Sequence, residues 1–527
     1  MLIGIDFDNT IACYDKVFQE VAKNQKIVNK NWIGNKTDLK KLILKSKKGK
    51  ELWMKIQGMV YGQYMKNAEI MDGFVNFLKV TKLLDVDVCI ISHKTKYGHF
   101  DKNKIDLRKE ALKWIKKNKI LDANKVYFAN TREEKISLIN DLKCDIFIDD
   151  LIEVLDHDNL NKNIKKIHLS SRNSSKIINF SNWHDIKKNI FKNDEHFIKK
   201  CFEKNSENKI LQINPVKGRG NSKVFKIKTK NKNFALKLYP DKNLDHRKRQ
   251  QIEFEALNLL MREGFKNIPS TEFKNDELNI SAFTWIEGNE PKRLNQDHIN
   301  QAVKFIKKLK KISLRNNFKN KKASEACLSY NELIRQISHK KVNLLDKNKN
   351  EKILIKFISE KLSPISKELI RQGKITWPQE SRTLNLQWDK RILSPSDFGF
   401  HNSLVTKDKK LYFIDFDYFG WDDPVKLIAD FYWHPGMDLN SSLKKLWLGQ
   451  TKKIFIDDDI FFSDRLHASL PLYGIRWVLI ILNIFDDNVA SRRLHANKIS
   501  KTELKEIKKI QLDKADKMLD KILNFNF

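Results

Sequence analysis

The chain has 527 residues, and 101 Lys and Arg against 66 Asp and Glu give it a formal net charge of +35. At about 150 residues per domain this length predicts several domains, and a hydrophobic content of 41% excludes an intrinsically disordered chain. The five cysteines lie far apart without a C-x-x-C pair, which excludes a disulfide framework and a cysteine-rich zinc module.

Residues 1–170 alternate short apolar segments with helix-like segments, which predicts a parallel sheet with helices on both faces. The predicted strands are Leu2–Ile5, Val86–Ile91, Lys125–Phe128 and Asp145–Ile148. Residues 14–75 are too long for a single crossover and carry helical apolar spacing, as at Trp53 and Ile56. We therefore expect a Rossmann-like α/β domain with a helical cap inserted over residues 14–75.

Residues 171–205 are rich in Ser, Asn and Lys, and this composition predicts a linker. Residues 206–290 are strand-rich, with one helix expected from Leu244 to Glu263. Residues 291–527 are mostly helical apart from a hairpin at Ser403–Phe416. A strand-rich lobe followed by a helical lobe predicts an α+β bilobal domain.

The acidic segment Asp6-Phe7-Asp8-Asn9-Thr10 directly follows the first predicted strand. Open α/β sheets bind ligands at the carboxyl ends of their strands, so both carboxylates are presented at that edge. One carboxylate can attack a phosphorus atom while the other transfers the proton. The alternative is that Asp8 and Asn9 only form a turn.

Polar residues at two other strand ends favour the catalytic interpretation. Ser92 follows the second strand and can donate a hydrogen bond to a phosphoryl oxygen, and Asp149 follows the fourth strand. Lys135 begins a helix-like segment fourteen residues before Asp149. A carboxylate nucleophile that faces a phosphate needs positive charge, which Mg²⁺ and a lysine supply. Asp6, Asp8 and Asp149 are therefore predicted Mg²⁺ ligands.

Residues 1–170 resemble the haloacid dehalogenase (HAD) superfamily in its phosphatase branch. The four motifs stand as IDFDNTI, IISHKT, Lys135 and FIDDLIEVL. The resemblance implies that Asp6 is the nucleophile, which forms an aspartyl-phosphate, and that Asp8 is the general acid and base. The alternative is a degenerate domain kept for structure, although no motif residue is missing.

The same resemblance assigns the supporting groups. It implies that Thr10 and Ser92 bind the phosphate and that Lys135 counters its charge. Asp149 would bind Mg²⁺, with Asp150 or Glu153 as a supporting group. The inserted helical segment would be the cap that selects the substrate.

In the second half, Lys237 lies on a predicted strand, on the face opposite to Leu236. A lone lysine on a strand is usually solvated, but this one follows a glycine-containing turn at residues 216–221 that can cover phosphates. The next helix carries Glu253 on its core side, where a carboxylate needs a cationic partner. We predict an ion pair between Lys237 and Glu253, whereas the alternative, Glu255, is expected to be more exposed.

The segment Ser394–Asn402 (SPSDFGFHN) precedes the predicted hairpin. If the hairpin turns at Asp408-Lys409, Asn402 lies opposite Asp415, and two oxygen ligands across the hairpin base make a Mg²⁺ site. A kinase needs such a pair together with a base for the acceptor hydroxyl, for which Asp397 is placed just before the hairpin. The alternative is an ordinary polar hairpin.

This half resembles the aminoglycoside phosphotransferase and choline kinase-like superfamily, which has a protein-kinase-like fold. The matching segments within residues 206–440 are Lys237, Glu253, FTWIEGNEP, SDFGFHN and IDFDYFGWDDP. The resemblance implies ATP and Mg²⁺, with Lys237 on the α- and β-phosphates. It further implies Asp397 as the base and Asn402 and Asp415 as metal ligands.

The chain departs from this pattern at Pro395, where the family usually has a histidine two residues before the catalytic Asp. The departure keeps open the alternative that the kinase-like half is not catalytic. The fused phosphatase–kinase layout is also similar to proteins associated with bacterial surface-polysaccharide gene clusters, which would make the acceptor a sugar or an amino alcohol.

These patterns predict a bifunctional enzyme that hydrolyses a phosphomonoester and phosphorylates a small-molecule hydroxyl with ATP. Nucleic-acid end-repair enzymes also fuse such a phosphatase to a kinase, but their kinase half is built on a P-loop, and no G-x-x-x-x-G-K-[ST] occurs here. The charge of +35 is spread over both halves, so we treat it as a compositional background and expect no nucleic-acid partner.

The longest apolar run, Leu470–Phe485, is interrupted by Arg476 and is predicted to be a buried helix, not a membrane span. Tyr473, Arg476 and Trp477 in this run either belong to the core or line an acceptor pocket. The start, MLIGIDFDNT, lacks the basic-then-apolar pattern of a signal peptide. We therefore expect a cytoplasmic protein whose partners are a hydroxyl acceptor and a phosphomonoester.

Overall fold

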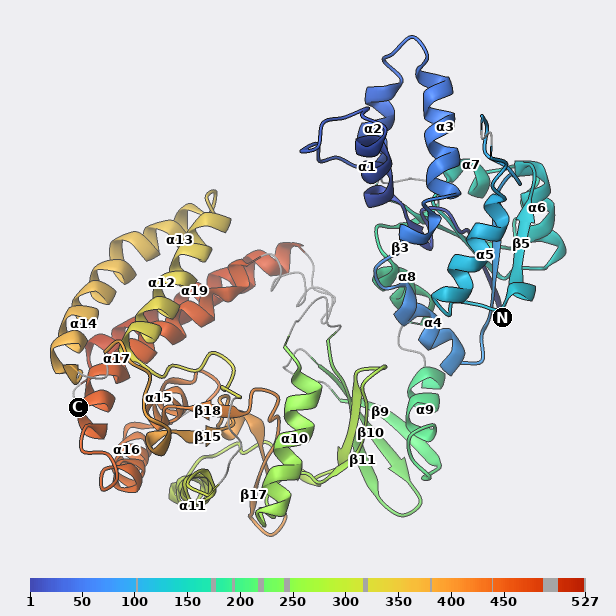
Figure 1. Cartoon of the computed structure of the whole chain (residues 1–527). Coiled ribbons are helices and arrows are strands. Elements are labelled where there is room, and N and C mark those ends of the chain that lie inside the picture. Colours follow the sequence, from blue (N-terminus) through green and yellow to red (C-terminus); the bar gives the residue numbers. More distant parts are fainter. Residues whose placement is uncertain are drawn as a thin grey trace. The chain divides into compact units, whose positions relative to one another are not determined.

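A computed structural model describes the chain except for residues 101–102, 172–176, 192–194, 217–221, 241–246, 316–320, 380–381, 438, 487–500 and 526–527, and the side chains of 501–502. The described residues form two compact units, Met1–Glu207 and Asn208–Phe527, which we call the N-terminal and C-terminal units. Each unit has its own sheets and helices (Figure 1). The glycine-containing turn predicted at residues 216–221 lies almost entirely outside the described residues.

The N-terminal unit is built on a six-stranded sheet in the order β5-β4-β1-β6-β7-β8, and all neighbouring strands are parallel. The strands are β1 (Leu2–Ile5), β4 (Asp87–His93), β5 (Val126–Ala129), β6 (Ile146–Asp149), β7 (Lys165–Leu169) and β8 (Ile178–Phe180). The predicted parallel sheet and its four strands are thus confirmed. The strand order reverses at β1, so a crevice for a ligand is expected where β1 lies between β4 and β6.

Helices surround this sheet and build the inserted segment. The sheet helices are α4 (Phe74–Leu83), α5 (Leu107–Lys117), η2 (Ala123–Lys125), α6 (Arg132–Asp141), α7 (Ile152–Leu155), α8 (Trp183–Phe191) and α9 (Glu195–Glu203). The inserted segment holds α1 (Asp15–Asn24), α2 (Lys36–Ile43), α3 (Gly49–Tyr61) and η1 (Met65–Asn67). Figure 1 shows α1, α2 and α3 grouped together. A short antiparallel pair, β2 (Ala12–Cys13) with β3 (Glu69–Ile70), closes the base of this segment.

The predicted linker over residues 171–205 is wrong. This segment contains β8, which pairs with β7, and the helices α8 and α9. Trp183 is 1% exposed, packs against Phe74 and Phe77, and donates a hydrogen bond from its indole nitrogen to the Thr10 carbonyl oxygen at 2.8 Å. The prediction failed because the segment is polar on average, although it contains short apolar stretches that are buried by contacts with residues far along the chain.

The C-terminal unit begins with a five-stranded antiparallel sheet in the order β12-β13-β11-β10-β9. Its strands are β9 (Ile210–Val216), β10 (Lys223–Thr229), β11 (Asn233–Leu238), β12 (Thr271–Asn275) and β13 (Ile280–Thr284). Helix α10 (Arg249–Arg262) packs against β12 and β13. This sheet and helix position Lys237 and Glu253.

Small sheets and helices make up the rest of the C-terminal unit. The sheets pair β14 (Gly288–Asn289), β16 (Ser403–Thr406) and β17 (Leu411–Phe413), and β15 (Ile392–Ser394) with β18 (Gly420–Asp422). The helices are α11 (Gln296–Ser313), α12 (Tyr330–Lys347), α13 (Lys352–Lys356), η3 (Phe357–Leu362), α14 (Ser363–Thr376), η5 (Trp388–Lys390), η6 (Phe400–Asn402), α15 (Pro424–Trp433), α16 (Ser441–Phe455), α17 (Phe462–Ile481), η7 (Leu482–Phe485) and α19 (Lys501–Leu523). One core cluster joins most of these elements.

The apolar stretch Phe462–Phe485 is the one described helix long and apolar enough to cross a membrane by length and composition, with a mean hydropathy of 1.6. However, 78% of its most apolar window is buried inside the unit, where α17 packs against α14, α15 and α19. The prediction of a buried helix over Leu470–Phe485 is therefore confirmed.

We expect Trp183→Ala to destabilise the N-terminal unit by about 3–5 kcal/mol, because it removes a buried aromatic side chain and a hydrogen bond. Urea unfolding followed by fluorescence measures this change. The control is Trp388→Ala in the C-terminal unit, where the tryptophan is 45% exposed. A loss for Trp183→Ala no larger than that of the control would place α8 outside the folded unit.

Candidate active sites

A buried lysine bridges two carboxylates at the carboxyl ends of β1 and β6. Lys135 Nζ lies 2.6 Å from Asp6 Oδ1 and 2.7 Å from Asp149 Oδ2, and the three residues are 1%, 5% and 0% exposed. Thr131 caps α6 by accepting a hydrogen bond from the Glu134 amide, which starts the helix one turn before Lys135. Asp6 and Asp149, predicted at two strand ends, are thus joined by Lys135 of α6, which was predicted at the start of a helix.

The charges of this cluster are not balanced by protein groups alone. Burial alone would lower the pKa of Lys135, but the charges of Asp149 and Asp6 outweigh burial and raise this pKa above its ordinary value. The ammonium therefore stays charged. Burial raises the pKa of Asp6 well above its ordinary value, and the charge of Asp149 adds to the rise although Lys135 opposes it. A further cation at this position would relieve the excess negative charge.

Carboxylate oxygens of Asp6, Asp149 and Asp150 lie within 4.8 Å of one another and could hold a metal ion. Burial, followed by the charge of Asp149, raises the pKa of Asp150 to about 7. Converging carboxylate oxygens fit a hard divalent cation such as Mg²⁺. Asp150, predicted as a supporting group, belongs to this set, whereas the side chain of Asp8, also predicted as a ligand, does not.

Asp8 is held by two residues that the motif analysis did not single out. The Tyr14 hydroxyl donates to Asp8 Oδ1 at 2.5 Å, and Lys94 Nζ lies 3.0 Å from Oδ1 and 2.9 Å from Oδ2. Lys94 is 3% exposed. The sequence did offer one indication that Lys94 belongs to the site: it stands two residues after Ser92, at the end of the same strand.

The inserted helical segment reaches Asp8 through aromatic side chains. Tyr14 is the residue before α1, and its ring makes an edge contact with Tyr61, the last residue of α3, with centroids 4.9 Å apart. Lys94 Nζ lies 4.7 Å from the centroid of the Tyr61 ring. The segment predicted as a cap therefore contributes side chains beside Asp8.

Thr10 and Ser92, the predicted phosphate-binding residues, are both buried at this edge of the sheet. The Thr10 hydroxyl donates to Asp6 Oδ2 at 3.3 Å. Ser92 lies inside β4, not after it, because the pairing with β5 continues through His93. Ser92 Oγ is buried without a hydrogen-bond partner among the described residues. Buried hydroxyls rarely stay unpaired, so this atom fits an oxygen of a ligand.

In the C-terminal unit, a second buried lysine bridges two carboxylates. Lys237 Nζ lies 2.7 Å from Glu253 Oε2 and 2.7 Å from Asp415 Oδ1, so the ion pair expected with Glu253 is present. Burial alone would lower the pKa of Lys237, but the charges of Asp415 and Glu253 outweigh burial and raise this pKa above its ordinary value. Burial raises the pKa of Glu253 despite Lys237, and Tyr239 donates to the same carboxylate oxygen at 2.7 Å.

Asp417 and Arg249 extend this cluster. Arg249 Nη1 lies 2.8 Å from Asp417 Oδ2, which is 4.0 Å from Lys237 Nζ. Burial and the charge of Asp415 raise the pKa of Asp417 to about 7. The sequence motifs did not point to Arg249. The carboxylates of Glu253, Asp415 and Asp417 thus share two cations, Lys237 and Arg249. This excess of negative charge suits a divalent cation.

Asp397 is held in place by two residues that follow it in the same loop, His401 and Asn402. The Asn402 side-chain amide donates to the Asp397 backbone oxygen at 3.0 Å and to its Oδ2 at 3.2 Å, and His401 Nε2 lies 3.0 Å from Oδ1. Burial raises the pKa of Asp397, but the hydrogen bond and charge of His401 outweigh it and lower the pKa to about 2. The carboxylate is therefore ionised and able to accept a proton.

His434 joins this group and was missed, as His401 was. Its Nε2 lies 3.8 Å from Asp397 Oδ1, and burial and the charge of His401 lower its pKa to about 3. The rings of His401 and His434 stack with centroids 3.6 Å apart at an angle of 7°. Ligand atoms of Asp397, His401 and His434 all lie within 4.8 Å of one another, so this group is a second place in the described residues that could hold a metal ion.

The hairpin register differs from the prediction by one residue. Ser403 pairs with Phe413, which places Asn402 opposite Ile414, whose amide donates to the Asn402 carbonyl oxygen at 2.9 Å. The expected pairing of Asn402 with Asp415 is wrong because residues 407–409 form a three-residue loop with Lys409 at φ 60°. Asp415, at φ 66°, leaves the ladder, and its carboxylate turns to Lys237.

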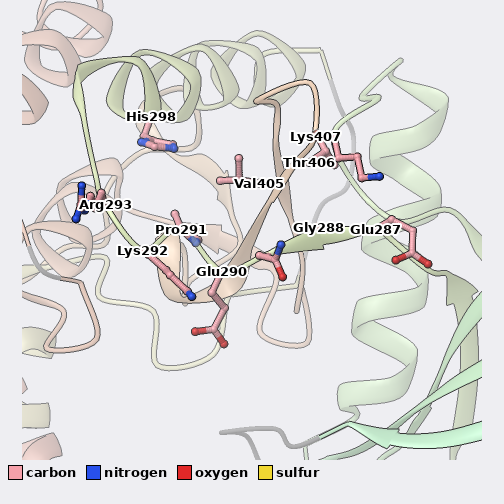
Figure 2. Close-up of a pocket in the computed structure, with 11 residues that line it drawn as sticks. Glu287, Gly288, Glu290, Pro291, Lys292, Arg293, His298, Val405, Thr406 and Lys407 are labelled. Carbon is pink, nitrogen blue, oxygen red and sulfur yellow. The ribbon is translucent and has the colours of Figure 1, made fainter.

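A cavity of about 480 Å³ lies elsewhere in the C-terminal unit (Figure 2). It is lined by residues 287–293 around β14, by Val405, Thr406 and Lys407 after Asn402, and by His298 of α11. Acidic and basic side chains of its rim point outward without converging on one point (Figure 2). None of Lys237, Asp397 and Asp415 lines this cavity.

No protein-family model and no curated protein matches the chain. Among solved structures, it is similar to spectinomycin phosphotransferase APH(9)-Ia in complex with ADP and spectinomycin, at 14% identity over 61% of this chain and 97% of that chain, with a TM-score of 0.39. It is also similar to choline kinase LicA from Streptococcus pneumoniae (16% identity, 62% and 99% coverage, TM-score 0.38). A Plasmodium vivax ethanolamine kinase matches at 15% identity, 58% and 81% coverage, and TM-score 0.38.

We expect Mg²⁺ to stabilise the protein through the Asp6, Asp149 and Asp150 group, by about 2.7 kcal/mol at a concentration 100 times the Kd. Thermal unfolding with Mg²⁺ and with EDTA measures the shift, and Asp149→Asn should reduce it. The control is Asp145→Asn, which changes a nearby side chain that is 59% exposed. An equal shift in the Asp149→Asn variant would contradict this metal site.

Proposed function

We propose that the chain is a bifunctional phosphoryl-transfer enzyme. Its C-terminal unit would transfer a phosphoryl group from ATP to a hydroxyl of a small molecule, and its N-terminal unit would hydrolyse a phosphomonoester. The observation that carries the kinase proposal is the pairing of Lys237 with Glu253 and Asp415, in the same unit as a fixed, ionised Asp397.

In the kinase reaction, Lys237 would bind phosphate oxygens, because its ammonium is charged and its direction is fixed by Glu253. Asp415 and Asn402 are the residues that would hold Mg²⁺, which when bound neutralises charge on the phosphates. Asp397 would accept the proton of the acceptor hydroxyl as its oxygen attacks the γ-phosphorus. The Asn402 side chain keeps the Asp397 carboxylate directed during this transfer.

In the phosphatase reaction, Asp6 would attack the phosphorus atom and form an aspartyl-phosphate, while Asp8 would donate a proton to the leaving oxygen. A water molecule would then hydrolyse this intermediate and return Asp6. The unpaired Ser92 Oγ supports this proposal, because a phosphoryl oxygen would supply its missing partner. Lys135 would counter the charge of the phosphoryl group, and Lys94 and Tyr14 would orient Asp8.

The acceptor would approach Asp397 beside His434 and Trp477, whose rings make an edge contact with centroids 4.5 Å apart. Tyr473 and Arg476 are 2% and 3% exposed, which supports the core alternative for both. Trp477 is only partly buried. An aromatic ring beside the base suits the apolar face of a sugar or the alkyl groups of an amino alcohol.

Asp397→Asn should lower kinase turnover by about 10²- to 10⁴-fold, because the acceptor loses its base, while ATP binding persists. An ADP-release screen over sugars, amino alcohols and aminoglycosides measures turnover, and calorimetry measures ATP binding. Asp408→Asn is the control, because this exposed hairpin carboxylate lies outside the site. Full activity of Asp397→Asn would contradict the assignment of the base.

Asp6→Asn should abolish hydrolysis of sugar phosphates and of p-nitrophenyl phosphate without changing the kinase reaction, since the amide is not a nucleophile. Phosphate release measures the first activity, and the ADP assay measures the second. Asp145→Asn serves as the matched control in this unit. If Asp6→Asn still hydrolyses phosphomonoesters, the aspartyl-phosphate mechanism is wrong.

A further inference from the structure

We propose that Lys426 is a positioning residue for the kinase reaction, acting through the Ser396 hydroxyl on the turn that carries Asp397. This inference rests on the proposed function of the C-terminal unit. Lys426 lies on α15 and makes no hydrogen bond or ion pair with Asp397 among the described residues, but its ammonium lies 3.1 Å from Ser396 Oγ, one residue before Asp397.

Ser396 adopts an unusual backbone conformation just before Asp397. Its φ is 66°, in the left-handed region that a serine rarely occupies. The Ser396 amide donates to Ser394 Oγ at 3.0 Å, and the Ser396 hydroxyl donates to the Ser324 carbonyl oxygen at 3.1 Å. Pro395 offers neither a backbone N–H nor a polar side chain. The turn therefore depends on Ser396 and its partners to stay in this conformation.

Lys426 can hold Ser396 because its own ammonium is fixed by two buried ion pairs. Its Nζ lies 3.1 Å from Asp422 Oδ2 and 3.1 Å from Asp430 Oδ2, and the residue is 1% exposed. The ammonium thus makes ion pairs with two carboxylates and donates a hydrogen bond to Ser396 Oγ.

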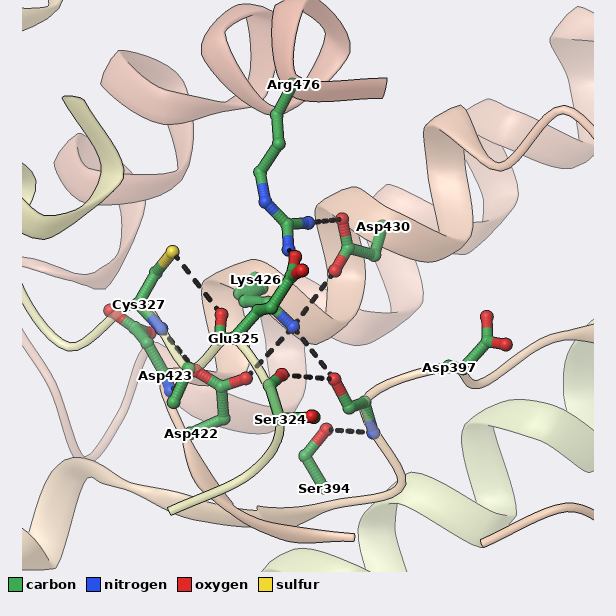
Figure 3. A network of polar contacts seen from close by, with 12 residues as sticks. Ser324, Glu325, Cys327, Ser394, Asp397, Asp422, Asp423, Lys426, Asp430 and Arg476 are labelled. Carbon is green, nitrogen blue, oxygen red and sulfur yellow. Dashed lines mark hydrogen bonds and ion pairs between the residues drawn. The ribbon is translucent and has the colours of Figure 1, made fainter. Parts of the chain in front are cut away.

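The two carboxylates tie Lys426 to more distant parts of the unit. Asp430 contacts Arg476 of α17 at 3.3 Å, and Arg476 also contacts Glu325 (Figure 3). Asp422 Oδ1 accepts a hydrogen bond from the Cys327 amide at 3.0 Å. The turn before Asp397 is thus fastened to α15, α17 and the segment around Ser324.

Stability alone is a weak reason for a buried lysine between carboxylates, because desolvation offsets much of the attraction. Directing a reactive carboxylate is a stronger reason, since a displacement of about 1 Å at a reacting group can cost roughly 100-fold in rate. The contact with Ser396 supplies that direction: it fixes the backbone from which the Asp397 side chain extends.

The test compares Lys426→Met, Ser396→Ala and the double variant in the full chain. Each single variant should lower kcat by roughly 10- to 100-fold while the KM for ATP stays within about twofold. If Lys426 acts through Ser396, adding Lys426→Met to Ser396→Ala should change kcat by less than about twofold. Effects that multiply in the double variant, or an unchanged kcat in Lys426→Met, would overturn the proposal.

Arg465→Met is the matched control for a merely structural effect. Arg465 is also 1% exposed and paired with two carboxylates, Asp423 at 3.1 Å and Asp459 at 2.6 Å. Among the described residues it makes no hydrogen bond or ion pair with residues 394–402. Arg465→Met should lower the Tm and leave kcat within about twofold. An equal fall in kcat for Arg465→Met and Lys426→Met would reduce Lys426 to a structural role. If Lys426→Met does not fold, Lys426→Gln and Ser396→Ala carry the same test.

Amide hydrogen exchange gives a readout that does not depend on turnover. Lys426→Met and Ser396→Ala should increase exchange at the Asp397 amide, which donates to the Pro395 carbonyl oxygen at 2.8 Å, whereas Arg465→Met should not. If the wild-type protein transfers no phosphoryl group to any acceptor, the proposed function fails, and exchange still decides the positioning role. Unchanged exchange at this amide in both variants would overturn it.

Discussion

A buried lysine held between two carboxylates recurs three times and organises both units. Lys135 lies between Asp6 and Asp149, Lys237 between Glu253 and Asp415, and Lys426 between Asp422 and Asp430. A buried ion is stable only when it is paired, so each lysine fixes the elements that carry its carboxylates. Because each group has one more carboxylate than ammonium, it can accept a further cation or hydrogen-bond donor.

The surroundings of each cluster decide what the extra carboxylate does. Around Lys135 and Lys237 the neighbouring carboxylates Asp150 and Asp417 add negative charge, and burial raises the pKa of each to about 7. Those two clusters therefore suit a divalent cation and phosphate. Around Lys426, Arg476 supplies a second cation, so the charges of that group are balanced by protein residues and it can hold its neighbours in place. The formal charge of +35 had little part in this, since buried lysines define the sites.

Much of the N-terminal fold could be predicted because its signals are local. The strands stand out as short continuous apolar runs, because both faces of the parallel sheet are covered, and polar residues such as Asp6 and Asp149 mark their ends. Two of the missed residues contact partners far along the chain: Lys94 contacts Asp8, 86 positions away, and Arg249 contacts Asp417, 168 positions away. Tyr14 and His401 lie close in sequence to Asp8 and Asp397, but spacing alone did not show which side chains turn toward these carboxylates. The predicted linker failed for the same reason, because burial of Trp183 depends on Phe74 and Phe77. The predicted hairpin register was wrong by one residue, because the loop has three residues and Lys409 adopts a left-handed conformation in it.

The sequence by itself determined the strands of the parallel sheet, the helical nature of the inserted segment and the polar residues at the strand ends, because neighbouring residues set these features. It also predicted the ion pair of Lys237 with Glu253, whereas only the tertiary structure showed that Asp415 shares this lysine. Lys237 and Asp415 are 178 positions apart and meet through the packing of β11 and the segment after β17. The tertiary structure also decided that Asp150, and not Asp8, joins Asp6 and Asp149. Such contacts depend on the register and packing of whole elements, which local spacing does not encode.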